Sequence, residues 1–368
     1  MKKLLYLAAA VLVTTTSQAQ QGQGESGGKP QGGQQVVISD LNELHRYLVG
    51  SAAENKFSGV VQIAKAGDVL FQEACGFASK SLTVPNRTDT KFNLGSINKL
   101  FTAIAVLQLA EKGLLSLDDP IRKYLDMFPA EIADSVKIIH LLTMQSGWGD
   151  YWDNGYFKAH RNELRTVSDY MAFIKDMPLD FQPGTNAQHS NTGFEVAGAI
   201  IEKVTGVDYY QYIRKHIYEP MGMENSGSYH TDNTVDNVAI GYTNENPYDS
   251  AKTDYTWSNM HLMPPRGTPA GGGYSTAEDL LKFAQGLRGN VLLGQDYTNF
   301  LLNGFQGKPG DSILPMLLKG VWRSVGGAQG ISAVLGMDLK DGYSYIVLSN
   351  YDFPAAYDVF QLIYKLKL

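Results

Sequence analysis

An apolar segment that begins directly after Ser96-Ile97-Asn98-Lys99 places the strongest constraint on this chain. Residues 100–107 are apolar on nearly every face, which predicts a helix that is buried all round. Because side chains at positions i and i+3 share one face of a helix, Ser96 Oγ and Lys99 Nζ can be neighbours. A buried lysine loses hydration, and this loss lowers the pKa of its amine. The chain is therefore expected to fold around a desolvated lysine beside a serine.

Such a pair has the composition of an acyl-transfer site. A serine hydroxyl is a weak nucleophile at neutral pH and needs a base within hydrogen-bond reach. Residues 92–95 indicate a strand or loop, so Ser96 falls at a helix N-terminus, where free N–H groups favour an oxyanion. The structural alternative is that Ser96 only caps the helix and Lys99 extends to solvent. A second copy of the pattern at residues 26–29 has no helical context, so the tetrapeptide alone does not establish a site.

The N-terminal residues predict export to the periplasm or the extracellular space. Residues 1–19 combine a charged start, an apolar stretch and small residues, which is typical of a secretory signal peptide cleaved after Ala19. That apolar stretch is too short to span a bilayer, and no later segment is apolar enough to do so. Residues 20–36 are rich in Gln, Gly and Ser and predict a flexible linker. Residues 37–368 are predicted to form the functional domain.

Composition narrows the partners and cofactors. One cysteine, Cys75, excludes an internal disulfide, and its apolar context predicts a buried strand residue. The net charge of −6 and the lack of a basic run argue against nucleic acid as a partner. The histidines show no metal-ligand spacing, so neither a metal nor another cofactor is expected.

The two ends of the domain indicate strands and its middle indicates helices. The predicted elements are two hairpins over 59–71 and 331–348 and helices over 195–204, 276–287 and 355–368. This order predicts an α/β (α+β) fold, in which one discontinuous antiparallel sheet from both termini carries an inserted, mostly helical lobe. The sheet lobe is expected at about 37–95 and 310–368, and the helical lobe at about 96–309. A cleft between two lobes is a usual place for a site.

Several further segments stand in a recognisable order: 92–107, 141–147, 189–194, 269–276 and 323–330. With them the chain resembles the serine β-lactamase and penicillin-binding-protein superfamily, in the branch of class C β-lactamases, D-alanyl-D-alanine carboxypeptidases and related esterases. The resemblance runs from about Phe57 to the C-terminus. It implies a β-lactamase/transpeptidase-like fold.

The family's catalytic elements are Ser-x-x-Lys, Tyr-x-Asn, and Lys-Thr-Gly or His-x-Gly. By resemblance, Ser96 is the acylated nucleophile and Lys99 removes or shares its proton. Asn191 matches the asparagine that orients the substrate amide, but the expected tyrosine is His189. An imidazole with a pKa near 6.5 can accept the Ser96 proton and return it to the leaving group. The alternative is that His189 is a satisfied polar residue in a degenerated site.

The third element departs further from the family. Ser324, Val325 and Gly326 stand where a cation, a hydroxyl and a glycine are expected to bind substrate. In the family the cation and the hydroxyl bind the substrate carboxylate, so both of these side-chain anchors are missing here. Strand alternation sends Arg323 to the face opposite Ser324, unless a twist or bulge of the strand restores it. The oxyanion hole is implied to survive because it consists of backbone N–H groups, those of Ser96 and Gly327. Losing one such donor typically costs about 3 kcal/mol.

Aromatic residues follow the 141–147 segment. The run from Trp148 to Phe157, including Trp152, predicts a loop that covers the substrate and shapes an apolar pocket. The alternative is that these aromatics only pack on the helical lobe.

These observations together predict an exported serine hydrolase that forms an acyl-enzyme with an ester or amide, on a small-molecule or peptide substrate. A second interpretation is a weakened relative that binds peptide or cell-wall fragments without turnover. A third, a true β-lactamase or D-Ala-D-Ala carboxypeptidase, is disfavoured by the altered third element.

Overall fold

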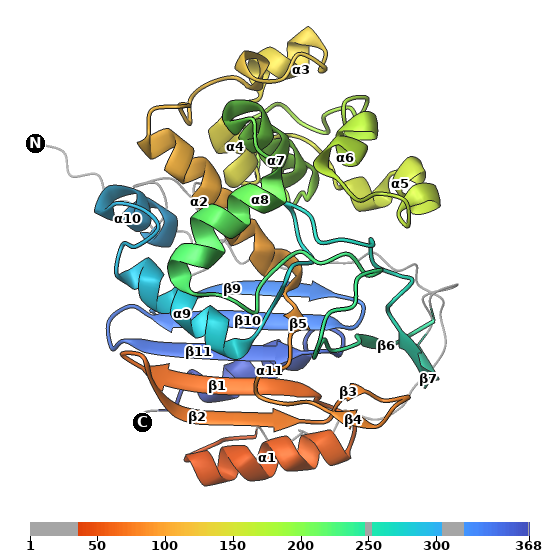
Figure 1. Ribbon diagram of the computed structural model, residues 1–368, viewed down its shortest axis with the longest axis vertical. Helices are drawn as coiled ribbons and strands as arrows, with labels where there is room; N and C mark the ends of the chain where they lie inside the picture. The colour runs from red at the N-terminus through yellow and green to blue at the C-terminus, as the bar shows by residue number, and fades with distance from the viewer. Residues whose placement is uncertain (1–35, 247–251, 304–319, 367) are drawn as a thin grey trace, which may run out of the picture. The chain divides into compact units, whose positions relative to one another are not determined.

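A five-stranded antiparallel sheet brings together strands from the two ends of the chain (Figure 1). The computed structural model describes residues 36–246, 252–303, 320–366 and 368. The predicted signal peptide and the linker up to residue 35 lie outside the described residues. The strand order is β2-β1-β11-β10-β9, with β1 (Gly59–Lys65), β2 (Asp68–Cys75), β9 (Val321–Ala328), β10 (Ile331–Asp338) and β11 (Tyr343–Ser349). The predicted discontinuous antiparallel sheet and both hairpins are confirmed.

Helices cover both faces of this sheet. On one face, Val61 and Ile63 of β1 pack with α1 (Leu41–Ala53) and α11 (Ala355–Ile363). On the other face, their neighbours in β1 join the larger core that contains α2. Because successive side chains of a strand point to opposite faces, a strand covered on both sides is apolar throughout. Accordingly β1 is buried from its first residue to its sixth.

The remaining elements lie between β2 and β9. The helices are α2 (Asn98–Glu111), α3 (Ala130–Ser135), α4 (Ile138–Leu142), α5 (Gly155–His160), α6 (Val167–Ile174), α7 (Thr192–Thr205), α8 (Tyr209–Ile213), α9 (Ala277–Arg288) and α10 (Gln295–Asn303). Short helical turns occur at η1 (Gly95–Ile97), η2 (Ile121–Lys123), η3 (Tyr151–Asp153), η4 (Arg214–Tyr218) and η5 (Glu219–Met221). Three strand pairs complete the fold: β3 (Phe77–Ser79) with β4 (Val84–Pro85), β5 (Phe92–Asn93) with β8 (Tyr274–Ser275), and β6 (Tyr242–Glu245) with β7 (Lys252–Ser258).

Local sequence signals explain the helix ends. The hydroxyl of Thr276 accepts the N–H of Asp279 and caps α9. Helix α7 ends at Gly206, whose φ of +67° lies in the left-handed region. The predicted helices over 195–204 and 276–287 are therefore confirmed within a few residues. The C-terminal helix α11 ends at Ile363, five residues before the predicted end.

Helix α9 departs from the predicted division into lobes. The sequence assigns residues 277–288 to the helical lobe, whereas Gln62 Nε2 of β1 donates to the Ala277 carbonyl of α9 at 3.5 Å. The helix therefore covers the sheet face that lies nearest to α2. Among the described residues, no helix is both long and apolar enough to cross a membrane.

Candidate active site

Ser96 lies at the start of the buried helix α2. Strand β5 leads into the turn η1, which contains Ser96 as a half-buried residue. In α2, every residue except Glu111 is buried, as expected for a helix that is apolar on all faces. Lys99, one turn after Ser96, has no exposed surface. The fold thus holds a lysine entirely out of water beside a serine that remains accessible.

The amine of Lys99 has three oxygen neighbours. Its Nζ lies 3.1 Å from Ser96 Oγ, 2.5 Å from Asn191 Oδ1 and 2.6 Å from the Ala270 carbonyl oxygen. A neutral amine has two N–H donors and one lone pair. The two acceptor oxygens of Asn191 and Ala270 can take both donors, so the lone pair can accept the hydroxyl proton of Ser96. The geometry therefore suits a base for this serine.

Burial also lowers the pKa of Lys99 to about 8, although the carboxylates of Asp150 and Glu195 act in the opposite direction. A substantial fraction of the amine is therefore neutral near physiological pH, as a base for Ser96 requires.

The edge strand β9 approaches η1 closely because glycines stand at the contact. Gly95 has a φ of +50°, a conformation that L-residues with a Cβ rarely adopt. A Cβ on Gly326 would lie 1.9 Å from the Leu94 carbonyl oxygen and 2.9 Å from Ser96 N. A Cβ on Gly95 would lie 2.9 Å from Gly327 N. The backbone nitrogens of Ser96 and Gly327 are thus close together, and their role as an oxyanion hole stays a prediction.

Asn191 and His189 meet at Asp150. Asn191 Nδ2 donates to Asp150 Oδ2 at 2.7 Å, and His189 Nδ1 lies 3.4 Å from the same oxygen. The His189 side chain is 62% exposed, and within the described residues no hydrogen bond joins it to Ser96 or Lys99. The base at hydrogen-bond distance from Ser96 is Lys99, not His189.

Asp150 was not identified as a site residue from the sequence. Burial raises the pKa of its carboxyl, but contacts from His189, the Trp152 N–H and Asn191 outweigh burial and hold the pKa below its usual value. The only sequence signal was a carboxylate three residues after the end of the 141–147 segment. Its partnership with Asn191 and His189 is a product of the tertiary fold.

Glu195 is a second carboxyl that sequence reasoning missed. It lies in the first turn of α7 with no exposed surface, and burial raises its pKa to about 8. Neither carboxyl oxygen meets hydrogen-bond geometry with a donor among the described residues, although Thr268 and Tyr151 lie near it. In the sequence this glutamate marks only the beginning of a helical pattern. In the fold it adjoins Lys99 and raises the pKa of that amine.

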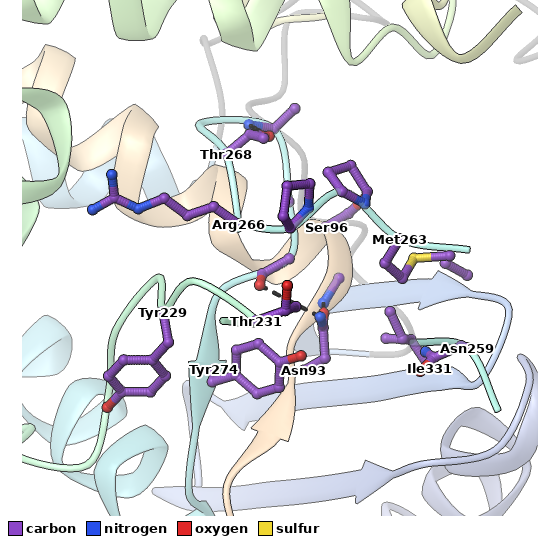
Figure 2. A pocket seen from close by; sticks show the side chains of 18 of the residues that line it. Asn93, Ser96, Tyr229, Thr231, Asn259, Met263, Arg266, Thr268, Tyr274 and Ile331 are labelled. Carbon is purple, nitrogen blue, oxygen red and sulfur yellow. Dashed lines mark hydrogen bonds between the residues drawn. The ribbon is translucent and has the colours of Figure 1, made fainter. Parts of the chain in front are cut away.

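A cavity of about 430 Å³ opens on Ser96 (Figure 2). Ser96, His189, Asn191 and Gly327 all line it, so the fold brings these predicted residues to one place. Much of the lining is apolar: Val235, Val238, Ile240, Met260, Met263, Pro264, Pro265 and Ile331. Arg266 also lines the cavity, but its guanidinium stacks on the Tyr210 ring, 3.3 Å from the ring centroid, and extends away from Ser96 (Figure 2).

The two predicted tryptophans have different places. Trp152 lines the cavity and packs edge-on against Phe157. Trp148 has no exposed surface, contacts Phe128, and donates its indole N–H to the Met177 carbonyl oxygen at 3.3 Å. The structure thus places Trp148 in the core of the helical region and does not bring it to the cavity.

The side chains of the third element also stay outside the cavity lining. Val325 packs against the core on the α11 face, and Ser324 on the other face is 4% exposed. The cavity is lined instead by Gly327 and the next residue of β9. Arg323 lies 5.2 Å from the Tyr357 ring centroid of α11, which confirms the face predicted from strand alternation. The prediction that Ser324 and Val325 line the substrate site is therefore not met. Val325 points to the α11 face of the sheet, and Ser324, on the other face, is covered by neighbouring residues.

Comparison with known proteins assigns the chain to a family. A family model described as Beta-lactamase matches residues 44–367. The chain belongs to the beta-lactamase family. Within it, the putative penicillin-binding protein PbpX of Bacillus subtilis (strain 168) is 32% identical over 263 residues, which cover 71% of this chain and 62% of PbpX. The chain therefore spans less than two thirds of that relative's length.

Two other family relatives support the same fold. Esterase EstB of Burkholderia gladioli is 28% identical over 267 residues, which cover 64% of this chain and 67% of EstB. The crystal structure of a penicillin binding protein from Bacillus halodurans superposes with a TM-score of 0.75 at 30% identity, over 89% of this chain and 99% of the other. The β-lactamase-like fold expected from the resemblance is thus confirmed.

Proposed function

We propose that this protein is an exported serine hydrolase that forms an acyl-enzyme on Ser96 with a neutral ester or amide. One observation carries the proposal: Lys99 Nζ, buried and with its pKa lowered to about 8, lies 3.1 Å from the Oγ of Ser96, which lines the cavity. The esterase named among the relatives supports hydrolysis as the reaction type. The signal-like residues 1–19 support export.

The proposed reaction balances with the groups present. In acylation, Ser96 Oγ bonds to the substrate carbonyl carbon and the bond to the leaving group breaks. Neutral Lys99 takes the hydroxyl proton, and the imidazolium form of His189 gives its proton to the leaving group. Water then attacks the acyl-enzyme, neutral His189 takes a proton from that water, and Lys99 returns its proton to Ser96 Oγ. One residue thus serves first as acid and then as base.

Intact mass spectrometry after exposure to a fluorophosphonate tests this proposal. One adduct on Ser96 is the expected result. A folded protein that gains none would instead support the second interpretation, a relative that binds peptide or cell-wall fragments without turnover.

We expect the rate of fluorophosphonate labelling to rise with pH and to level off above a midpoint near the Lys99 pKa of about 8. Fluoride is a weak base and leaves without a general acid, so this reaction isolates the base step. Glu195→Gln removes a carboxyl that raises the pKa of Lys99, and the midpoint should move to lower pH. Stopped labelling assays between pH 6 and 10 measure both profiles. A wild-type rate that is constant over this range would exclude Lys99 as the titrating base.

We also expect neutral apolar esters to be better substrates than penicillins. The cavity lining is largely apolar, and where the family has a cation and a hydroxyl that bind a carboxylate, Ser324 carries no charge and Val325 carries no hydroxyl. Each lost charge-assisted hydrogen bond is worth ~1.5–3 kcal/mol, so two correspond to a preference of at least ~10²-fold in kcat/KM. Steady-state assays with nitrophenyl esters and a penicillin measure this ratio. Met263→Trp, which narrows the apolar lining, should impair a nitrophenyl octanoate more than an acetate; efficient penicillin hydrolysis would contradict the assignment.

A further inference from the structure

We propose that Asp150 is a positioning residue that holds His189 in one tautomer and links it, through Asn191, to Lys99. This inference rests on the proposed function, because it assigns to His189 the proton transfers of that reaction. It concerns a residue outside the three sequence elements that define the site.

The contacts of Asp150 fix its carboxylate in place. Oδ1 accepts the Trp152 N–H at 3.1 Å, and Oδ2 accepts Asn191 Nδ2 at 2.7 Å. The side chain is only 20% exposed, so water competes little for these bonds. His189, by contrast, is 62% exposed, and Asp150 is the partner that its ring has among the described residues. An exposed ring with one buried partner takes its orientation from that partner.

The contact also selects a tautomer. An ionised carboxylate can only accept a hydrogen bond, so we assign the proton to Nδ1, the ring nitrogen that faces Asp150 at 3.4 Å. Nε2 is then the nitrogen that exchanges protons with the leaving group and with water. A carboxylate that orients a histidine in this way also stabilises the imidazolium when it forms. Tyrosine, with a single O–H, would need no such partner. We therefore infer that the carboxylate at position 150 is needed because position 189 holds a histidine in place of the family's tyrosine.

Other charges around His189 act through the same carboxylate. Lys99 of α2 contacts the opposite end of the Asn191 amide, and Glu195 of α7 lies beside Lys99. Across the cavity, His230 and Arg266 are the remaining ionisable side chains of its described lining apart from tyrosines. Asp150 thus contacts His189 directly and Lys99 through the Asn191 amide, the two groups that exchange protons in the proposed reaction, and its loss is expected to affect both.

Asp150→Asn tests the proposal, because asparagine keeps the size of the side chain but loses the charge. Hydrolysis of an alkyl ester, whose leaving group needs a proton, should fall by ~10²–10⁴-fold, the usual contribution of general acid–base catalysis. Labelling of Ser96 by the fluorophosphonate should remain within ~10-fold of wild type, since it depends on Lys99. Its pH midpoint should move to lower pH, because Asp150 raises the pKa of Lys99.

Two further measurements separate positioning from a general loss of structure. Nitrogen NMR of the full chain should find His189 protonated at Nδ1 in the wild type and as a tautomer mixture in Asp150→Asn. In a His189→Gln background, the Asp150 substitution should cost little more, and His189→Tyr should restore activity to Asp150→Asn.

The outcomes are distinguishable from failure of the proposed function. Absence of Ser96 labelling in the wild type would overturn the proposed function itself. Normal labelling together with unchanged alkyl-ester hydrolysis in Asp150→Asn would overturn only the role of Asp150. If that variant does not fold, the tautomer of His189 measured in the wild type tests the proposal. A His189 protonated mainly at Nε2 would refute it.

Discussion

Ser96→Ala and Lys99→Met are each expected to lower ester turnover by ~10⁴-fold or more, because a nucleophile and its base fail as a unit when either is removed. Ser96→Ala removes the hydroxyl oxygen that is proposed to be acylated. Lys99→Met keeps an unbranched side chain of similar volume in a site with no exposed surface, but it removes the amine 3.1 Å from Ser96 Oγ. Fluorophosphonate labelling followed by intact mass measures the first step, and ester hydrolysis measures the whole cycle.

The two variants should differ in stability, which provides an internal control. Ser96→Ala deletes one hydroxyl from a half-buried turn and should leave the melting temperature close to that of wild type. Lys99→Met leaves the Asn191 and Ala270 oxygens without their donor, at ~1–3 kcal/mol for each buried acceptor. The cost of burying an amine is relieved at the same time. A folded Lys99→Met that still labels Ser96 at the wild-type rate would show that another group takes the proton.

Most of the fold could be predicted because its signals are local. Apolar strands on either side of Gly-containing turns predict the hairpins. Capping residues and the spacing of apolar residues predict α7 and α9. The packing of α9 against the sheet could not be predicted in the same way. The amphipathic pattern of α9 predicts that one face of the helix is buried, but it does not indicate whether a sheet or another helix covers that face.

The site was predictable where its residues share one turn of chain or one recognised motif. Ser96 and Lys99 meet because a helix brings positions i and i+3 together. Asp150 and Glu195 could not be found in this way, since only tertiary packing places them beside Asn191 and Lys99. Trp148 was assigned to the cavity from its residue type, whereas the direction in which a loop side chain points depends on packing that sequence does not reveal.

Gly326→Ala is expected to be the most damaging change that leaves every catalytic side chain in place. Its Cβ would lie 1.9 Å from the Leu94 carbonyl oxygen and 2.9 Å from Ser96 N, and both of these atoms belong to backbone that cannot rotate away. Strand β9 and turn η1 must therefore separate by ~1 Å, a displacement that can cost ~10²-fold in rate. Overpacking of this kind usually destabilises a protein by ~1–3 kcal/mol.

Gly327→Ala, one residue along the same strand, is the matched control. Its Cβ would meet Phe353, with the nearest atoms at 3.0–3.3 Å, and Phe353 is a side chain with half of its surface exposed. A contact at 3.0 Å requires Phe353 to shift by only a few tenths of an ångström, whereas the 1.9 Å contact in Gly326→Ala cannot be tolerated, so labelling should fall much less than in Gly326→Ala. Both variants keep the N–H at position 327, so a difference between them reports the spacing of β9 and η1. Equal labelling rates in the two variants would show that this close approach does not position the nucleophile.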